Sequence, residues 1–214
     1  NTEGLYSGIE HKIGDYGAET IKIITKPACE RICEFAFNYA KDNNRKKVTG
    51  VHKANIMKLS DGLFLNTFRD IASKYPDIKS DDLIVDAACM NLVINPEKYD
   101  VMVMPNLYGD IVSDLCSGLV GGLGMIPGAN IGKDYAVFEA VHGSAPDIAG
   151  KNIANPTAII QSSVMMLRYL GEQEAAAKIE NALVKVFEKG ENLTGDLGGN
   201  ATTDEFTNEI LKYI

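Results

Sequence analysis

Two aspartates one helical turn apart are the residues of this chain that could most directly bind a divalent cation. They end the segment from Val101 to Asp114, which begins as an apolar run, turns between Pro105 and Gly109, and is predicted to open a helix at Asp110. At positions i and i+4 both carboxylates project from one helix face, where like charges cost a few tenths of a kcal/mol. A bound cation would offset this repulsion. A second interpretation needs no metal, because an aspartate in the first turn of a helix complements the helix dipole.

The loop predicted to follow a buried strand at residues 135–140 contains a second set of residues that could bind a ligand. It reads His-Gly-Ser-Ala-Pro-Asp-Ile from His142 to Ile148. Its small residues permit close approach of the backbone to a phosphate, and the His142 ring could stack or donate a hydrogen bond. Asp147 could accept from ribose hydroxyls and repel a 2′-phosphate, which would select NAD over NADP. An ordinary surface loop is the alternative interpretation of this composition.

Predicted strands and helices alternate along the chain, which indicates an α/β fold with a largely parallel sheet. An arm or hairpin is expected over residues 5–24, and the glycine-dense residues 118–132 are expected to form a loop between domains. No G-x-G-x-x-G motif follows a strand, so a Rossmann dinucleotide site is not predicted. Strands are expected at residues 47–52, 83–85, 101–104 and 135–140, and helices at 26–43, 55–73, 86–94, 110–120, 156–170 and 172–189, with a last helix after a capping box at 202–205.

Composition limits the classes of partner. The chain has 214 residues, of which 45% are hydrophobic and 23% charged, enough for one large domain or two small ones. A net charge of −8 without a basic stripe argues against nucleic acid as a partner. The sequence contains no apolar run of about 18 residues, so a membrane span is not predicted, and no secretory signal is visible. The four cysteines lack the spacing of a zinc site, so reduced thiols in a reducing compartment are expected.

Four motifs, in order along the chain, resemble those of the β-decarboxylating dehydrogenases. They are Asn-Thr-Glu-Gly-Leu-Tyr-Ser-Gly at residues 1–8, Val-His-Lys-Ala-Asn-Ile-Met at 51–57, Pro-Asn-Leu-Tyr-Gly-Asp-Ile-Val-Ser-Asp at 105–114, and Val-His-Gly-Ser-Ala-Pro-Asp-Ile-Ala-Gly at 141–150. Within that family the chain is most similar to the NAD-dependent isocitrate dehydrogenases. The resemblance implies the isocitrate/isopropylmalate dehydrogenase-like α/β fold, which is not a Rossmann fold.

The resemblance also implies a division into domains. A small domain with the arm, the dimer interface and the metal ligands is expected at residues 1–122. The C-terminal part of a large dinucleotide-binding domain is expected at residues 123–214.

Catalytic roles follow from the matching motifs. Tyr6 matches the family's catalytic acid, which protonates the enolate carbon after CO₂ leaves. Lys53 matches the lysine that acts near the substrate hydroxyl. Its positive charge is expected to orient the substrate. Asn55 in the same motif is expected to lie near the substrate.

Asp86, Asp110 and Asp114 match the family's ligands for Mg²⁺ or Mn²⁺, cations that prefer oxygen ligands. In this family Lys53 and Asp86 serve the active site of the neighbouring subunit. A homodimer, or a hetero-oligomer with homologous subunits, is therefore expected to be the active form.

The resemblance further implies that the loop after residue 140 binds the adenosine part of NAD. The residues that match this role are His142, Gly143, Ser144, Ala145, Pro146, Asp147, Ile148 and Asn155.

The implied reaction is metal-dependent oxidative decarboxylation of isocitrate to 2-oxoglutarate with reduction of NAD, in the cytoplasm or the mitochondrial matrix. Homoisocitrate and isopropylmalate are alternative substrates, and the motif at residues 1–4 disfavours isopropylmalate. A non-catalytic regulatory subunit, or a truncated chain that only assembles, is an alternative of another class. The family's front portion, with its substrate-binding arginines, is expected to be missing ahead of Asn1.

Overall fold

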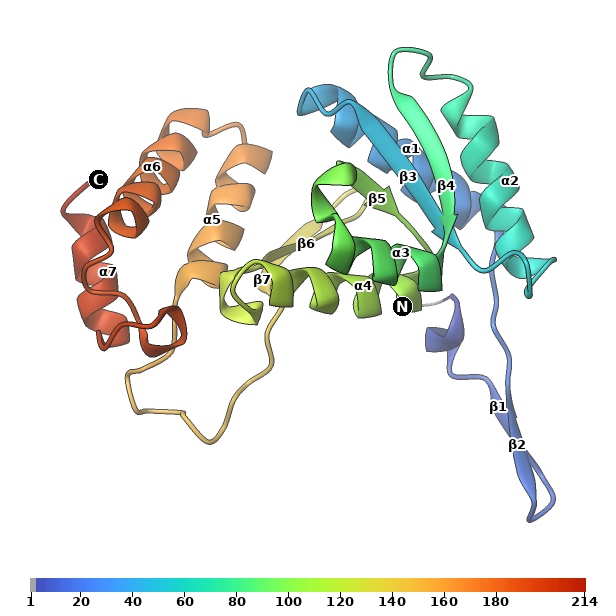
Figure 1. Ribbon diagram of the computed structural model, residues 1–214, viewed down its shortest axis with the longest axis horizontal. Helices are drawn as coiled ribbons and strands as arrows, with labels where there is room; N and C mark the ends of the chain where they lie inside the picture. The colour runs from blue at the N-terminus through green and yellow to red at the C-terminus, as the bar shows by residue number, and fades with distance from the viewer. Residues whose placement is uncertain (1–2) are drawn as a thin grey trace. The chain divides into compact units, whose positions relative to one another are not determined.

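The computed structural model describes residues 3–214, and its contacts divide the chain into two compact units, residues 1–116 and 117–214 (Figure 1). The first two residues of the motif at 1–8 lie outside the described residues. Each unit has its own hydrophobic core. Within residues 3–214, no helix is both long and apolar enough to cross a membrane.

The first unit contains a parallel sheet, a β-hairpin and the helices that follow their strands. Its elements are η1 (Leu5–Ser7), β1 (Glu10–Ile13), β2 (Gly17–Thr20), α1 (Lys26–Asp42), β3 (Lys47–His52), α2 (Ser60–Ala72), β4 (Lys79–Ile84), α3 (Val85–Ile94), η2 (Pro96–Lys98), β5 (Val101–Val103) and the start of α4 (Asn106–Leu119).

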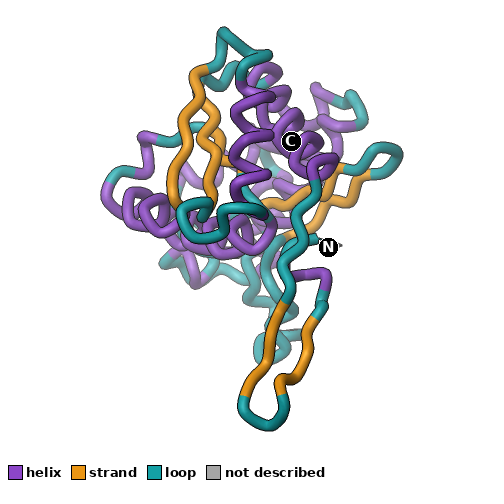
Figure 2. The backbone as a smooth tube through the Cα atoms, turned by 90° about the vertical axis from the view of Figure 1, so that its right-hand side faces the viewer, coloured by secondary structure: helices purple, strands orange, loops and turns teal. Residues whose placement is uncertain are grey.

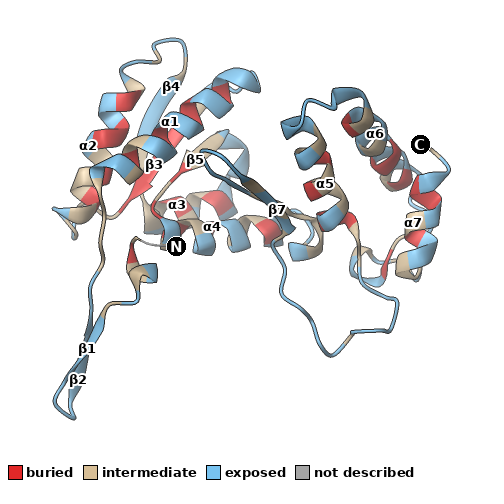
Figure 3. Ribbon diagram, turned by 180° about the vertical axis from the view of Figure 1, so that it is seen from behind, coloured by how far each residue is buried: buried red, intermediate tan, exposed pale blue. Residues whose placement is uncertain are grey.

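The parallel sheet has the strand order β4-β3-β5, with β3 as the buried central strand. α1 and α2 pack against each other and against β3, and Figure 3 shows their buried residues in red. The core between them contains Phe37, Phe64 and Phe68, which are fully or almost fully buried. Burial of such aromatic side chains is the main term that stabilises this layer.

The predicted hairpin is present and exposed. β1 and β2 pair in antiparallel register from Glu10 opposite Thr20 to Ile13 opposite Gly17, and every residue of both strands is exposed. Figure 2 shows the hairpin extending from the rest of the first unit. A two-stranded ribbon with no buried face contributes little to the stability of its own unit.

The second unit packs helices beside an antiparallel strand pair. Its elements are η3 (Leu123–Met125), β6 (Pro127–Ile131), β7 (Ala136–Ala140), α5 (Thr157–Tyr169), α6 (Gln173–Lys189), η4 (Gly195–Leu197) and α7 (Thr203–Leu211). α5 contacts both strands and α6, and α6 contacts α7 around a core that includes Phe206. The predicted capping box is confirmed, because Thr202 accepts from the Glu205 N–H while the Glu205 carboxylate accepts from the Thr202 N–H.

The structure corrects four expectations about elements. α2 begins at Ser60 rather than 55, because residues 53–59 form turns. α4 begins at Asn106 rather than 110. The glycine-dense residues 118–132 contain β6, where a Cβ at Gly128 would lie 3.1 Å from the carbonyl oxygen of Glu139. Parallel pairing is confined to the sheet of the first unit, since β6 and β7 pair antiparallel.

Candidate active site

The carboxyl edge of the parallel sheet carries most of the residues predicted to be catalytic or metal-binding. Lys53 directly follows β3, and Asp86 is the second residue of α3, which directly follows β4. Two residues separate the end of β5 from the start of α4. Because β3 pairs with both other strands in parallel, the three segments leave the sheet at the same edge. This edge is where open α/β sheets bind ligands. Asn55 is exposed on the turn that carries Lys53.

Lys53 and Asp86 form an ion pair within one chain. The Lys53 Nζ lies 2.5 Å from Oδ1 of Asp86, and the Asp86 carboxylate is largely exposed. The hydrogen bond from Lys53, with help from the local backbone, holds the pKa of the Asp86 carboxyl below its ordinary value. Asp86 therefore stays ionised, the form in which a carboxylate can ligate a metal.

Asp110 and Asp114 are both exposed on α4, as their spacing predicts. Since α4 begins at Asn106, Asp110 is its fifth residue, and no acidic residue stands in its first turn. The favourable effect of the helix dipole falls off within that first turn. The interpretation in which the helix dipole stabilises this pair is therefore wrong, and the repulsion between the two carboxylates has no compensation from the dipole.

The three predicted metal ligands do not gather into one cluster within a single chain. Among residues 3–214, no group of three or more His, Cys, Asp or Glu side chains is placed to hold a metal. A site that combines Asp110 and Asp114 of one protomer with Asp86 of its partner would not be visible in one chain. The donors are all carboxylate oxygens, a set that fits Mg²⁺ or Mn²⁺.

A buried carboxylate beside Lys53 was missed by the sequence analysis. The Asp61 side chain is fully buried, and it accepts hydrogen bonds from the Lys53 N–H at 2.7 Å and the Tyr108 hydroxyl at 2.9 Å. Its other oxygen pairs with the ammonium of Lys22, which also lies 4.5 Å from the centroid of the Tyr108 ring. Burial, together with the Asp61 carboxylate, raises the pKa of Tyr108. A sequence signal exists, because Asp61 shares a helical spacing with the buried Phe64 and Phe68.

Tyr6 stands on η1, between two glycines that have left-handed backbone angles. Gly4 has φ 69° and Gly8 has φ 67°, a region that side chains with a Cβ rarely adopt. Gly4 exchanges backbone hydrogen bonds with Ile23, which ties this turn to the chain after the hairpin. Tyr6 is 37% exposed, so the residue is not enclosed in the core of its unit.

The predicted adenosine-binding loop lies in the second unit. Residues 142–147 are exposed, while Ile148 and Asn155 are half-buried. Ala145 has φ 41° and begins a turn that the Ile148 N–H closes on the Ala145 carbonyl at 3.1 Å. A hydrogen bond of 2.9 Å from the His142 Nδ1–H to the Gly143 carbonyl leaves Nε2 of that ring free to accept.

The far end of this loop is held by side-chain hydrogen bonds that the sequence did not reveal. The Asn152 amide donates to Asp204 at the start of α7. Asn155 donates to Asp196 at 2.9 Å and accepts from the Thr157 N–H at 2.9 Å, so its amide is engaged at both ends. Asn155 therefore anchors the loop to α5 whatever else it binds.

The four cysteines lie outside the motifs that carry the predicted site residues. Cys29, Cys33, Cys89 and Cys116 are free thiols, and burial raises the pKa of Cys29 to about 11 and that of Cys33 to about 12. Buried thiols of high pKa are poor nucleophiles.

The family of isocitrate/isopropylmalate dehydrogenases matches residues 1–210 of the chain. The chain belongs to this family. The fold expected from the four motifs is thereby confirmed. A crystal structure of isocitrate dehydrogenase from Methylococcus capsulatus agrees with it, at a TM-score of 0.94 and 53% identity, over 100% of this chain and 65% of that one.

Two curated relatives of this chain are named as subunits of NAD isocitrate dehydrogenase. A protein of Drosophila melanogaster, named as the probable mitochondrial alpha subunit of NAD isocitrate dehydrogenase, is 60% identical over 214 residues. A protein of Dictyostelium discoideum, named as a mitochondrial regulatory subunit of NAD isocitrate dehydrogenase, is 59% identical over 215 residues. Both alignments cover 100% of this chain, but the chain spans only 57% and 61% of the length of these relatives.

Proposed function

We propose that the protein which carries this chain converts isocitrate to 2-oxoglutarate and CO₂ with reduction of NAD. The observation that supports this most strongly is the carboxyl edge of the sheet, where Lys53, Asp86 and the aspartates of α4 leave neighbouring strands. The names of the relatives support NAD and a mitochondrial location. The domain boundary between residues 122 and 123 is part of the same proposal.

The reaction removes a hydride and a proton from the carbinol group, then CO₂, and finally adds a proton to the enolate carbon. Lys53 lies near the substrate hydroxyl, where its ammonium orients the anionic substrate and favours loss of the hydroxyl proton. The exposed Tyr6 hydroxyl donates the last proton to carbon. Asn55, two residues from Lys53, offers an amide to the substrate.

Asp110 and Asp114 of one protomer, with Asp86 of its partner, would hold Mg²⁺ or Mn²⁺. When bound, such a cation polarises the substrate oxygen and stabilises the negative charge that develops there. This assignment also accounts for how a chain of net charge −8 attracts an anionic substrate at the reacting end.

The loop from His142 to Ile148, with Asn155, binds the adenosine part of NAD. Its exposed small residues permit close approach to phosphate, and the Asp147 carboxylate accepts from ribose hydroxyls. A 2′-phosphate beside Asp147 would be repelled, which accounts for a preference for NAD over NADP.

NADH formation tests the proposal directly. The complete enzyme is assayed with Mn²⁺ and, in turn, isocitrate, homoisocitrate and isopropylmalate. We expect the highest kcat/KM with isocitrate. No turnover on any of the three would contradict the catalytic assignment, and a higher value for homoisocitrate would overturn the substrate.

A regulatory role is the second candidate function, because the Dictyostelium discoideum relative carries that name. Tyr6, Lys53 and the aspartates are all present, which favours a catalytic role. A regulatory chain would bind isocitrate in equilibrium titrations, and the substitution Tyr6→Phe would leave the turnover of the assembled enzyme unchanged.

The metal ligands are tested by Asp110→Asn, which keeps the side-chain volume and removes the charge. We expect kcat/KM to fall by roughly 100-fold or more, because the site loses one of its few anionic ligands. Asp70→Asn, on the exposed side of α2, is the matched control and should leave activity unchanged. If both variants keep wild-type activity at limiting Mn²⁺, Asp110 is not a ligand.

A further inference from the structure

The segment that carries Lys53 has neither strand nor helix to set its main chain. Residues 53–59 form turns between β3 and α2, in which Ile56 and Met57 donate to the Lys53 carbonyl at 3.0 and 2.9 Å. The N–H groups of Lys53 and Ala54 lie outside any strand or helix, so secondary structure does not supply their hydrogen-bond acceptors. Backbone donors that are withdrawn from water in this way are almost always paired.

Asp61 provides the acceptor for the first of these groups. Its Oδ2 accepts the Lys53 N–H at 2.7 Å, and the carboxylate is itself fully buried. Lys22 and Tyr108 also donate to it, from the chain after β2 and from α4. A buried carboxylate needs such partners, and with three of them in place it cannot move independently of the Lys53 turn.

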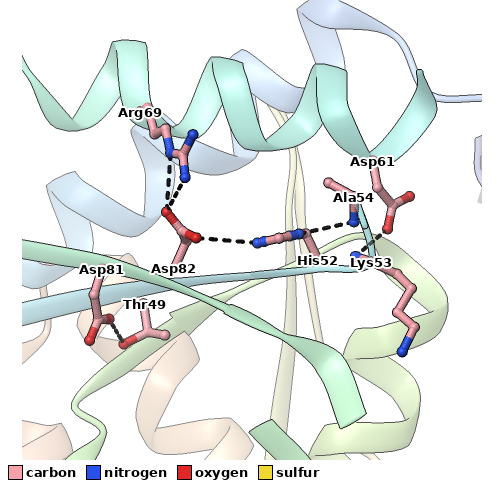
Figure 4. Close-up of polar contacts among 8 residues, drawn as sticks. All are labelled: Thr49, His52, Lys53, Ala54, Asp61, Arg69, Asp81 and Asp82. Atoms are coloured by element: carbon pink, nitrogen blue, oxygen red, sulfur yellow. Dashed lines mark hydrogen bonds and ion pairs between the residues drawn. The ribbon is translucent and has the colours of Figure 1, made fainter. Parts of the chain in front are cut away.

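His52 provides the acceptor for the second group. Its Nδ1 lies 3.0 Å from the Ala54 nitrogen, so Nδ1 must carry a lone pair and the ring proton must be on Nε2. Nε2 faces Oδ2 of Asp82 at 3.3 Å, while the other oxygen of Asp82 accepts two hydrogen bonds from Arg69 at 2.8 and 3.1 Å. Figure 4 shows this row from Arg69 to Ala54, with Asp61 on the other side of the turn.

The two bonds act on the peptide planes on either side of the Lys53 Cα. Because a peptide unit is planar, holding both planes sets φ and ψ of the residue between them. That in turn sets the direction in which the Lys53 side chain leaves the backbone toward Asp86.

We infer that Asp61 and His52 are positioning residues that hold Lys53 in its reactive orientation. The inference rests on the proposed role of Lys53 in catalysis. Neither side chain has to touch the substrate, since each acts through a main-chain N–H. Catalysis is sensitive to such support because a displacement of about 1 Å can cost about 100-fold in rate.

Two substitutions at His52 test the contributions of its two ring nitrogens separately. The Asn side chain in His52→Asn places an oxygen near the position of Nδ1 and can accept the Ala54 N–H in an Asx turn. The longer amide of His52→Gln reaches toward Asp82 instead. In the complete enzyme we expect His52→Gln to lower kcat by roughly 10- to 100-fold with little change in KM, and His52→Asn to recover most of that loss.

Asp61→Asn places an amide nitrogen against one of three donors and leaves Lys22 without a counter-charge, so it also threatens folding. It is expected to lower kcat at least as much as His52→Gln. If it fails to fold, the His52 pair still decides the question.

Thr49→Val is the matched structural control. It removes a hydrogen bond of 2.6 Å from the buried Thr49 on β3 to Asp81 on β4, which is separate from the hydrogen bonds to the Lys53 and Ala54 N–H groups (Figure 4). We expect its melting temperature to fall while kcat stays within about 2-fold of the wild type.

Lys53→Met distinguishes failure of the inference from failure of the proposed function. Wild-type activity in Lys53→Met would refute the proposed role of Lys53 itself. Loss of activity in Lys53→Met with wild-type kcat in His52→Gln would refute the positioning role, as would equal losses in His52→Gln and His52→Asn.

Discussion

Glu209 shows how a single buried carboxylate is held in this chain. Its side chain is almost fully buried on α7, and it accepts from Lys212 at 2.6 Å, Lys189 at 3.2 Å and Asn192 at 3.0 Å. These partners, Lys212 first, lower the pKa of Glu209 from 4.5 to about 2. A folded-state pKa below the unfolded value means that ionised Glu209 stabilises the fold above pH 4.5. This contribution is lost as the pH falls from 4.5 toward 2.

Glu209→Gln should therefore destabilise the protein most at neutral pH. The difference in urea midpoint from the wild type should shrink as the pH falls from about 4.5 toward 2, because over that range the unfolded state binds a proton at Glu209 while the folded state keeps the carboxylate ionised. Glu188→Gln, on the exposed side of α6, is the control and should show no such pH dependence. A difference that is constant with pH would show that Glu209 acts through packing alone.

Single residues also show where sequence reasoning ended. The spacing of Asp110 and Asp114 predicts them, and the resemblance to the family adds Tyr6, Lys53 and Asp86. Asp61 and His52 were not found, because a bond from a side chain to a main-chain N–H depends on the path of the turn. The path of the turn depends on the buried Asp61. Helical spacing can suggest that Asp61 is buried, but it cannot show which groups Asp61 binds.

At the scale of elements, β3 can lie against α2 only because residue 50 has no side chain. A Cβ built on Gly50 would lie 2.8 Å from Cδ1 of Phe68. Phe68 is itself 1% exposed and packs against Phe37, with ring centroids 5.7 Å apart, so it has no space to move away. Gly50 is needed for close packing, and His52 and Lys53 depend on the position of the same strand.

Gly50→Ala is thus expected to lower the free energy of unfolding by about 1–3 kcal/mol through overpacking. Gly62→Ala on α2 is the matched control, since its new methyl group meets no atom within 4 Å and alanine favours the helix. Urea unfolding of both variants measures the difference. Equal stability of the two would mean that the Phe68 ring yields easily.

Elements were predictable where one signal determined them. The apolar pattern predicts α1, β3 and α6, and the residues at 202–205 predict the capping box of α7. In these elements the apolar pattern and the local residues agree. It placed the start of α2 five residues early, since the apolar Ile56 and Leu59 continue the helical spacing although both are exposed in turns. The sequence pattern did not reveal β6, because its one glycine, Gly128, permits close approach to β7 rather than forming a loop: a Cβ there would lie 3.1 Å from the Glu139 carbonyl oxygen.

At the scale of the whole molecule, the proposed site would be complete only in an oligomer, because the proposal draws its parts from two protomers. Lys53 and Asp86 are paired within one chain, whereas no third acidic ligand joins Asp110 and Asp114 among residues 3–214. In a symmetric dimer each site would then combine Asp110 of one protomer with Lys53 of its partner. This arrangement predicts complementation between two inactive variants.

Lys53→Met and Asp110→Asn should each be inactive alone. In a hybrid dimer, the site that uses Asp110 of the Lys53→Met protomer meets the intact Lys53 of its partner, so one site of the two is complete. Random mixing of equal amounts should restore about a quarter of the wild-type NADH production, since half of the dimers are hybrids. Lys53→Met mixed with Asp86→Asn is the control, because both changes lie in the part that one protomer lends to the other, and no hybrid site is complete. No activity in the first mixture would place Lys53 and Asp110 in a site made by a single chain, and activity in the control would show that Lys53 and Asp86 serve different sites.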